Sequence, residues 1–394
     1  MKGNFWKVLA SSTLFVSMLV GCGSSESATS EPVELKEGDT VKVGVNFELS
    51  GPTATYGNAM EKGTRLAIDQ YNDNADSHYT IEKITFDNKG DAAEATTVAT
   101  KLMEEEQVIL QFGPATSGDS IATYPVSEQK QVPVLTAAVT QNGAMLKEDG
   151  TAYEYAWRVA FEDSAQASAM AVFAKQKDLK KAVIYSDNSS DYAKGLAKDF
   201  KKKFEKLGGT IVAEESYTQG DTDFNAALSK IKEMDFDVLY VPGYYNEGGL
   251  IVKQARDAGI AQTILGADGM DSPKLVELAG KKNLNNVYFT TAYTTVDASD
   301  ELQAFIQAYE EAYDESPDMF SVLAYDAAQL GLQALEEAGA TGSKLNAAIR
   351  SIQFDGLTGS FEFDEAHTPK KDVLVVELKD GEQVNPVHVD PNAK

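Results

Sequence analysis

Residues 41–72, VKVGVNFELSGPTATYGNAMEKGTRLAIDQYN, give the clearest indication of the fold class. Its first seven residues are rich in valine and are typical of a β-strand, whereas residues 58–72 carry apolar side chains at helical spacing. A loop that contains glycine and proline joins the two segments. A strand that runs through such a loop into a helix is the first part of a βα unit.

The same alternation recurs in two series along the chain. In the first series, Asp91 is the expected N-cap of a helical segment over residues 91–106. The second series begins after residue 161 and includes expected helices at 192–207 and 223–234. The further expected strands are ITFDN (84–88), QVILQFG (107–113), VPVLTA (132–137), KAVIYSD (181–187), GTIVAEESY (209–217), FDVLYVPGYY (236–245) and QTILGADG (262–269).

The two series predict an α/β fold with two lobes, each built on a doubly wound parallel sheet. Residues 299–350 have the pattern of a long helical region, and GSFEFD (359–364) and VLVVELKDG (373–381) form a β-rich tail. The globular part starts near residue 40, so about 350 residues need a core, which is more than one domain usually supports.

The segment that precedes residue 40 has a different composition. Two lysines lead into an apolar run over residues 8–20, which is typical of a signal peptide and too short to span a membrane stably. The run ends next to Cys22, the only cysteine of the chain, and this arrangement resembles the lipobox of bacterial lipoproteins. We expect residues 1–21 to be removed, Cys22 to carry the lipid anchor, and residues 22–39 to be a flexible tether. An ordinary signal peptide with an incidental cysteine is the alternative.

Acidic residues dominate the charge of the chain. There are 35 Lys and Arg against 61 Asp and Glu, and removal of the two lysines before Cys22 changes the net charge from −26 to −28. Such a surface repels nucleic acid and anionic lipid headgroups, so membrane association has to come from the lipid anchor. No second apolar run has spanning length. We expect a monomer that is held outside the membrane without crossing it.

The loops between strands and helices are where a site is expected, because parallel sheets bind ligands beyond the carboxyl ends of their strands. No such loop pairs a nucleophile with a base, since His78, His367 and His388 all lie outside these loops. The chain also has no Cys/His cluster, no calcium-loop spacing and no P-loop. We therefore expect a protein that holds a ligand without altering it, with no catalytic residue, metal or cofactor.

Seven motifs in order along the chain resemble the branched-chain amino-acid binding proteins of ABC importers, within the larger family of periplasmic-type solute receptors. They are SGPTATYGNAMEKGTRLAID (50–69), GPATSGDSIA (113–122), DNSSDYAKG (187–195), DTDFNAAL (221–228), VPGYYNEGG (241–249), GADG (266–269) and GLTGSFEFD (356–364). The resemblance implies two lobes joined by three crossovers, lobe 1 from residues 40–161 and 292–358 and lobe 2 from residues 162–291 and 359–394. It implies an extracytoplasmic receptor that captures leucine, isoleucine or valine by hinge closure and delivers it to an ABC permease.

The resemblance also implies the residues of the binding site. Ser117 matches the position that binds the α-carboxylate of the ligand. Ala138 and Thr140 match a loop whose backbone carbonyl and hydroxyl hold the ammonium end. Asp268 matches the acid that pairs with the α-ammonium, although close relatives carry glutamate there. Aromatic positions around the ligand side chain are matched by Tyr56, by Tyr192, and by Tyr244 or Tyr245.

Alternatives stay open for the residues and for the function. Ser117 is also a candidate for an ordinary helix N-cap, Asp268 for a solvated loop acid, and the tyrosines of 240–245 for core packing. The rival functions are a receptor of the same fold for an amide, urea or another amino acid, and a chemosensory or regulatory sensor. An enzyme is the least favoured. The lipobox suits a Gram-positive cell, in which an untethered receptor would diffuse away.

Overall fold

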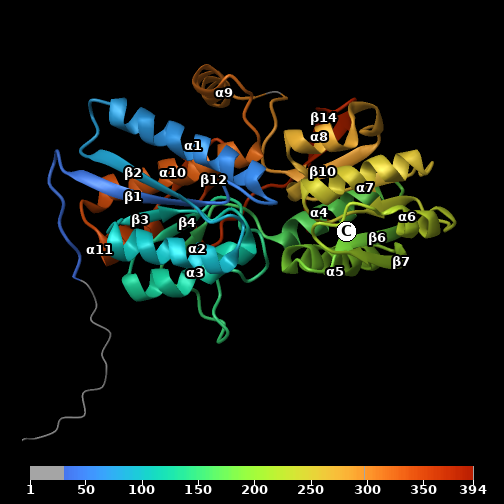
Figure 1. The fold of residues 1–394 in the computed structure, drawn as a ribbon, viewed down its shortest axis with the longest axis horizontal. Helices are drawn as coiled ribbons and strands as arrows, with labels where there is room; N and C mark the ends of the chain where they lie inside the picture. Colours follow the sequence, from blue (N-terminus) through green and yellow to red (C-terminus); the bar gives the residue numbers. More distant parts are fainter. Residues whose placement is uncertain (1–30, 297, 394) are drawn as a thin grey trace, which may run out of the picture.

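The computed structural model describes residues 31–296 and 298–393 and contains two α/β units that lie side by side (Figure 1). The predicted signal peptide and anchor residue Cys22 lie outside the described residues. The first unit has a five-stranded sheet in the order β2-β1-β3-β4-β5, in which every strand pair is parallel. Its strands are β1 (Thr40–Phe47), β2 (Thr80–Asp87), β3 (Leu110–Phe112), β4 (Val134–Thr136) and β5 (Ala156–Arg158).

The second unit has a seven-stranded sheet in the order β14-β13-β10-β9-β8-β6-β7. The five strands from β10 to β7 pair in parallel, and the chain then adds β13 and β14 in antiparallel fashion at the β10 edge. The predicted fold class is confirmed, with a mixed rather than purely parallel second sheet. Its strands are β6 (Lys181–Asp187), β7 (Thr210–Tyr217), β8 (Val238–Tyr240), β9 (Thr263–Leu265), β10 (Val287–Thr291), β13 (Leu374–Lys379) and β14 (Glu382–His388).

Helices cover the sheets of both units in pairs (Figure 1). In the first unit α1 packs on α10 and α2 packs on α3, and in the second unit α4 packs on α5 and α7 packs on α8. The helices are α1 (Ala54–Asp73), α2 (Ala92–Thr100), α3 (Ser117–Lys130), α4 (Asp163–Gln176), α5 (Asp191–Lys206), α6 (Asn225–Lys232), α7 (Tyr245–Asp257), α8 (Pro273–Ala279), α9 (Asp300–Tyr313), α10 (Met319–Ala338) and α11 (Gly342–Ser351), with short turns η1 (Lys101–Glu105), η2 (Asp268–Met270) and η3 (Lys281–Asn283).

Local capping explains where several helices begin and end. Asp91 is the N-cap of α2, as predicted, and its side chain accepts hydrogen bonds from the amides of Ala93 and Glu94. The region 299–350 is divided into α9, α10 and α11 rather than one helix. Asp318 and Ser321 form a capping box at the start of α10, and Gly339, with a φ of 56°, ends it in the left-handed region that glycine adopts at low cost.

The chain passes between the two sheets three times, after β5, after β10 and after the hairpin of β11 (Phe354–Gly356) and β12 (Gly359–Phe361). The predicted lobe boundary between residues 358 and 359 is misplaced, because it would cut this hairpin in two. The rings of Phe363 and His367 also lie against Trp157 of β5, at centroid distances of 5.0 Å and 3.6 Å. The chain therefore crosses to the second unit for the third time only after His367, between these contacts with the first unit and β13. The other lobe boundaries stay predictions.

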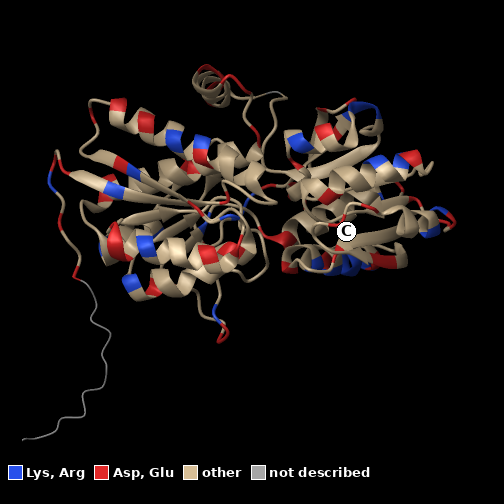
Figure 2. Cartoon of the chain, in the orientation of Figure 1, with Lys and Arg blue, Asp and Glu red and all other residues tan. Residues whose placement is uncertain are grey.

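Most charged residues belong to the helices and loops around the sheets of both units (Figure 2). Apolar side chains fill the space between helices and sheets, where β1 contributes the fully buried Val43 and Val45. Within the part of the chain that the structure describes, no helix is both long enough and apolar enough to cross a membrane.

Candidate ligand-binding site

A small cavity lies where the loops at the carboxyl ends of both sheets meet. It encloses about 20 Å³, room for about one water molecule. Seven of the eight residues predicted for the ligand site line it, and Tyr245 does not. The lining residues are Tyr56, Ala115, Thr116, Ser117, Ala138, Thr140, Tyr192, Tyr244, Asp268, Gly269 and Phe320. Their role in binding stays a prediction.

The N-terminus of α3 forms one end of the cavity. Thr116 is the N-cap of this helix, because its hydroxyl accepts a hydrogen bond from the Asp119 amide at 3.4 Å. The alternative that Ser117 is the N-cap is therefore wrong. The Ser117 hydroxyl accepts a bond from the Gln141 amide at 3.3 Å, and among the described residues no group accepts from the amides of Ser117 or Gly118. Two amide donors at the positive end of a helix dipole suit an anionic group.

Glu48 holds this helix start in place and was not predicted from the sequence. It follows β1 and is fully buried, and its carboxylate accepts the amides of Ala115 and Thr116 at 2.9 Å each. Burial and the charge of nearby Asp119 raise the pKa of Glu48 to about 8. The only signal in the sequence was an acid directly after a buried strand.

Arg158 at the end of β5 organises the loop that carries Ala138 and Thr140. The guanidinium is 1% exposed and donates from Nη1 to the Gln141 carbonyl at 2.9 Å and from Nε to the Thr368 hydroxyl at 2.9 Å. It also forms an ion pair with Glu162. These contacts set the position of Thr140 at the cavity wall. The sequence offered no signal for this role, because one arginine in a strand is equally compatible with a surface position.

Asp268 also lines the cavity, on the short turn η2 that follows β9. Its Oδ1 atom accepts three hydrogen bonds, from Gln166 Nε2 at 2.9 Å, from the Tyr192 hydroxyl at 2.6 Å and from the Gly269 amide at 3.0 Å. Its Oδ2 atom accepts none from the described residues. Burial raises the pKa of Asp268, and the bonds from Tyr192 and Gln166 oppose that shift. Asp268 is therefore a buried acid rather than a solvated loop residue.

Aromatic rings form the remaining wall. The Tyr56 ring lies 4.3 Å from the Phe320 ring and 5.8 Å from the Tyr244 ring, and Tyr244 stacks on Tyr192 at 5.2 Å. Phe320, in the first turn of α10, was missed because the sequence places it inside an apolar helix with no feature of its own. These rings add an apolar surface to the polar groups that line the cavity.

Tyr245 connects the two units outside the cavity. Its hydroxyl donates to the Pro52 carbonyl at 3.0 Å, and its amide donates to the Tyr56 hydroxyl at 3.3 Å. The Tyr56 hydroxyl in turn donates to the Gly269 carbonyl. Pro52 and Tyr56 belong to the first unit and Tyr245 and Gly269 to the second, so these bonds cross between the units.

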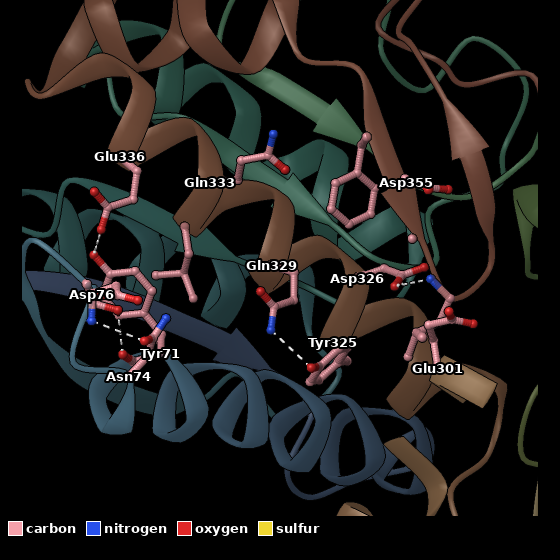
Figure 3. Close-up of a pocket in the computed structure, with 15 residues that line it drawn as sticks. Tyr71, Asn74, Asp76, Glu301, Tyr325, Asp326, Gln329, Gln333, Glu336 and Asp355 are labelled. Carbon is pink, nitrogen blue, oxygen red and sulfur yellow. Dashed lines mark hydrogen bonds between the residues drawn. The ribbon is translucent and has the colours of Figure 1, made fainter. Parts of the chain in front are cut away.

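A larger pocket of about 610 Å³ lies in the first unit, between α1, α10 and the β11–β12 hairpin (Figure 3). Its polar groups are largely bonded to one another. The Tyr71 hydroxyl donates to Glu336, Gln329 Nε2 donates to the Tyr325 hydroxyl at 3.0 Å, and Asp326 accepts the Leu357 amide at 2.9 Å. None of the predicted site residues lines this pocket. In the described ranges no group of three or more His, Cys, Asp or Glu side chains is placed to hold a metal ion.

Two α/β units joined by three crossovers, with a polar cavity where their loops meet, define a two-lobed binding protein. The chain belongs to the periplasmic binding protein family, whose model matches residues 40–383. It is similar to the structure of the branched-chain amino acid transporter substrate binding protein LivJ from Streptococcus pneumoniae in complex with isoleucine, at 38% identity and a TM-score of 0.85, over 89% of this chain and 100% of that chain.

Two further relatives agree with this assignment. The structure of the leucine binding protein LivK from Thermotoga maritima has 31% identity and a TM-score of 0.82, over 89% of this chain and 99% of that chain. The Leu/Ile/Val-binding protein homolog 3 of Brucella melitensis is 30% identical over 80% of this chain and 83% of its own length.

Proposed function

We propose that this protein captures leucine, isoleucine or valine outside the cytoplasm and delivers it to the permease of an ABC transporter. The observation that carries the proposal is the polarity of the cavity. The free amides at the start of α3, the carboxylate of Asp268 and several aromatic rings all line the same small space. A zwitterion with an apolar side chain needs this arrangement once water is excluded.

Each end of the ligand has its own set of partners in this proposal. The Ser117 hydroxyl and the amides of Ser117 and Gly118 bind the α-carboxylate. The Ala138 carbonyl, the Thr140 hydroxyl and Asp268 Oδ2 bind the α-ammonium, and the aromatic rings surround the side chain. Burial of a leucine side chain contributes roughly 1.5–3 kcal/mol, whereas micromolar affinity requires about 8 kcal/mol. The head-group contacts therefore supply most of the affinity, and similar aliphatic side chains are accepted.

The bonds between the units support a hinge mechanism. The cavity is smaller than an amino acid, so the units have to separate for the ligand to enter and then close on it. The hydrogen bonds of Tyr56 and Tyr245 across the interface are formed only when the loops meet. In this proposal the permease recognises the closed arrangement.

Loss of one of these bonds is expected to weaken binding moderately. Tyr245→Phe removes the bond from its hydroxyl to Pro52 without changing the ring. One neutral hydrogen bond stabilises the closed form by about 0.5–1.5 kcal/mol, so leucine affinity measured by calorimetry should fall about two- to tenfold. Tyr313→Phe is the matched control, because its hydroxyl bonds to the Lys62 carbonyl within the first unit. Equal affinities for the two variants would contradict the closure role.

The proposed location rests on Cys22 as a lipid anchor. Cys22→Ser should move most of the protein from the membrane fraction to the medium, because stable anchoring requires at least two acyl chains or a second signal. Fractionation of the cells with immunoblotting measures the distribution, and Ser24→Ala is the control. Equal membrane retention of the Cys22 variant and the control would show that the anchor is elsewhere. A Gram-positive host fits such a tethered receptor.

The experiment that tests the ligand is a calorimetric titration of the purified protein, stripped of bound ligand by unfolding and refolding. The panel is the twenty amino acids with urea and acetamide. Binding of leucine, isoleucine and valine above all others is the expected result. Preference for an uncharged amide or for urea, which have no ammonium group for Asp268, would contradict the proposal and favour another solute.

A further inference from the structure

A second carboxyl group lies behind Asp268. Asp163 begins α4, directly after the first crossover, and its side chain is completely buried. Its Oδ1 atom accepts a hydrogen bond from Gln166 Nε2 at 2.9 Å. Its Oδ2 atom is buried and has no hydrogen bond of good geometry among the described residues, although the Thr140 hydroxyl lies near enough to the carboxyl group to oppose the rise of its pKa. A buried carboxyl oxygen without a good hydrogen bond lowers the stability of the folded protein, so a functional role is expected at this position.

Gln166 links the two acids. Its Nε2 atom donates to Asp163 Oδ1 and to Asp268 Oδ1, at 2.9 Å in both cases. Its Oε1 atom accepts the Thr290 hydroxyl at 2.6 Å and the Asp268 amide at 3.2 Å. All four hydrogen bonds fit the same orientation of the Gln166 side-chain amide, with Nε2 toward the two carboxyl groups. The two carboxyl groups are therefore held on either side of a single amide nitrogen.

The surroundings of Asp163 hold little positive charge. The charged groups that act on it are Asp268 and Arg158, and Arg158 already pairs with Glu162. The phenol groups of Tyr192, Tyr240 and Tyr244 also face it. Burial and the charge of Asp268 raise the pKa of Asp163 well above its usual range, and burial raises that of Asp268. The pair therefore holds a proton more tightly in the closed protein than two exposed acids would.

We propose that Asp163 is a positioning residue of the ammonium end, which holds Asp268 through Gln166 and releases a proton when a cationic ammonium group enters the site. The proposal rests on the proposed function, because it takes the amino acid as the source of the cation. In the release step the O–H bond of the Asp163 carboxyl breaks, its electron pair stays on the carboxylate, and the proton passes to water or buffer.

The direction of the effect follows from the charges. A cation next to a pair of acids favours their ionised forms, so the bound state carries fewer protons than the free state. Affinity for a zwitterionic amino acid therefore rises with pH, by up to about tenfold per pH unit for one proton released. An uncharged ligand brings no such cation and binds without this release.

The test is calorimetry of leucine binding to the purified protein in two buffers with different ionisation enthalpies, together with affinities between pH 5.5 and 8.0. We expect release of a substantial fraction of one proton and an affinity that rises about tenfold over this range. Asp163→Asn has nearly the shape of the protonated acid and keeps an acceptor for Gln166. This variant should bind leucine with almost no proton release and an affinity change below about threefold across the same range.

Asp191→Asn is the matched control, because Asp191 occupies the same first position in α5 but its side chain is 73% exposed. It should release protons as the parent does. Leucine binding by the parent without proton release, or equal release from Asp163→Asn and the parent, would overturn the role of Asp163 and leave the proposed function intact. Failure of the parent to bind any amino acid would overturn both.

Discussion

Replacement of Asp268 by asparagine is expected to reduce leucine affinity by about 100-fold or more. The substitution keeps the size of the side chain but removes the negative charge from the Oδ2 atom that we propose binds the ammonium group. Loss of one member of a buried, hydrogen-bonded charge pair costs about 2–5 kcal/mol, and 100-fold corresponds to about 2.7 kcal/mol. Calorimetric titration with leucine measures the change.

The same substitution should make the ligand-free protein more stable. An acid whose pKa is raised in the folded state binds a proton more tightly there than in the unfolded chain. Its contribution to the free energy of unfolding is therefore highest below the unfolded pKa and is lost as the pH rises through the folded pKa. At neutral pH Asp268 destabilises the empty protein, and asparagine removes this effect. A higher melting temperature with weaker binding would separate a binding role from a folding defect.

Asp271→Asn is the matched control for this prediction. Asp271 lies three residues further along and is also buried, and burial together with the charge of Asp318 raises its pKa to about 8. It does not line the cavity. Its asparagine variant should keep leucine affinity within about threefold, less than the tenfold that 1.4 kcal/mol represents. Equal losses at both positions would show that Asp268 has no specific contact with the ligand.

Replacement of Arg158 by alanine is expected to destabilise the protein by about 3–5 kcal/mol and to abolish measurable binding. The change removes a buried side chain, leaves the Gln141 carbonyl and the buried Thr368 hydroxyl without their donor, and leaves Glu162, whose side chain is 32% exposed, without its ion-pair partner. The loop that carries Thr140 then loses its support. Denaturant unfolding measures the stability, and calorimetry at a temperature where the variant is folded measures the binding.

Arg65→Ala provides the comparison for Arg158. Arg65 also pairs with a glutamate four residues away, Glu61, but its side chain is 47% exposed. A partly exposed pair of this kind contributes about 0–1 kcal/mol, so this variant should unfold close to the parent and bind leucine normally. If the two arginine variants lost equal stability, burial would not be the reason for the importance of Arg158.

Much of the architecture could be predicted from local patterns. The alternation of strand and helix period located most strands of both sheets but missed β5, β10 and β14, and the side chain of Asp91 marked the start of α2. The predicted lobe boundary after residue 358 was wrong, because it divides the β11–β12 hairpin. In the sequence, a hairpin strand and a strand that crosses to the other unit both look like a short β-rich run, and only the strand pairing distinguishes them. The spacing of apolar residues shows which face of a helix or strand is apolar, but it does not show which other element packs against that face.

The site was predictable only in part, for the same reason. Ser117 and Asp268 could be predicted because they belong to motifs with a recognisable residue order, and Thr140 because its loop matches the family. No local sequence feature identifies Gln166 or Arg158 as part of the site, because a glutamine in a helix or an arginine in a strand is usually exposed. Their role depends on burial and on partners that are distant in the sequence, such as Asp268 for Gln166.

Local residue patterns were therefore enough to predict the fold class, the order of most elements and the loops that can meet a ligand, because these depend on period and on residue type over short distances. Which side chains share one enclosed space became known from the folded structure. It placed Phe320 in the cavity and Tyr245 outside it, and it joined Asp163 to Asp268 through Gln166. Burial and charge interactions depend on distance in space, and folding brings together residues that are more than 100 positions apart.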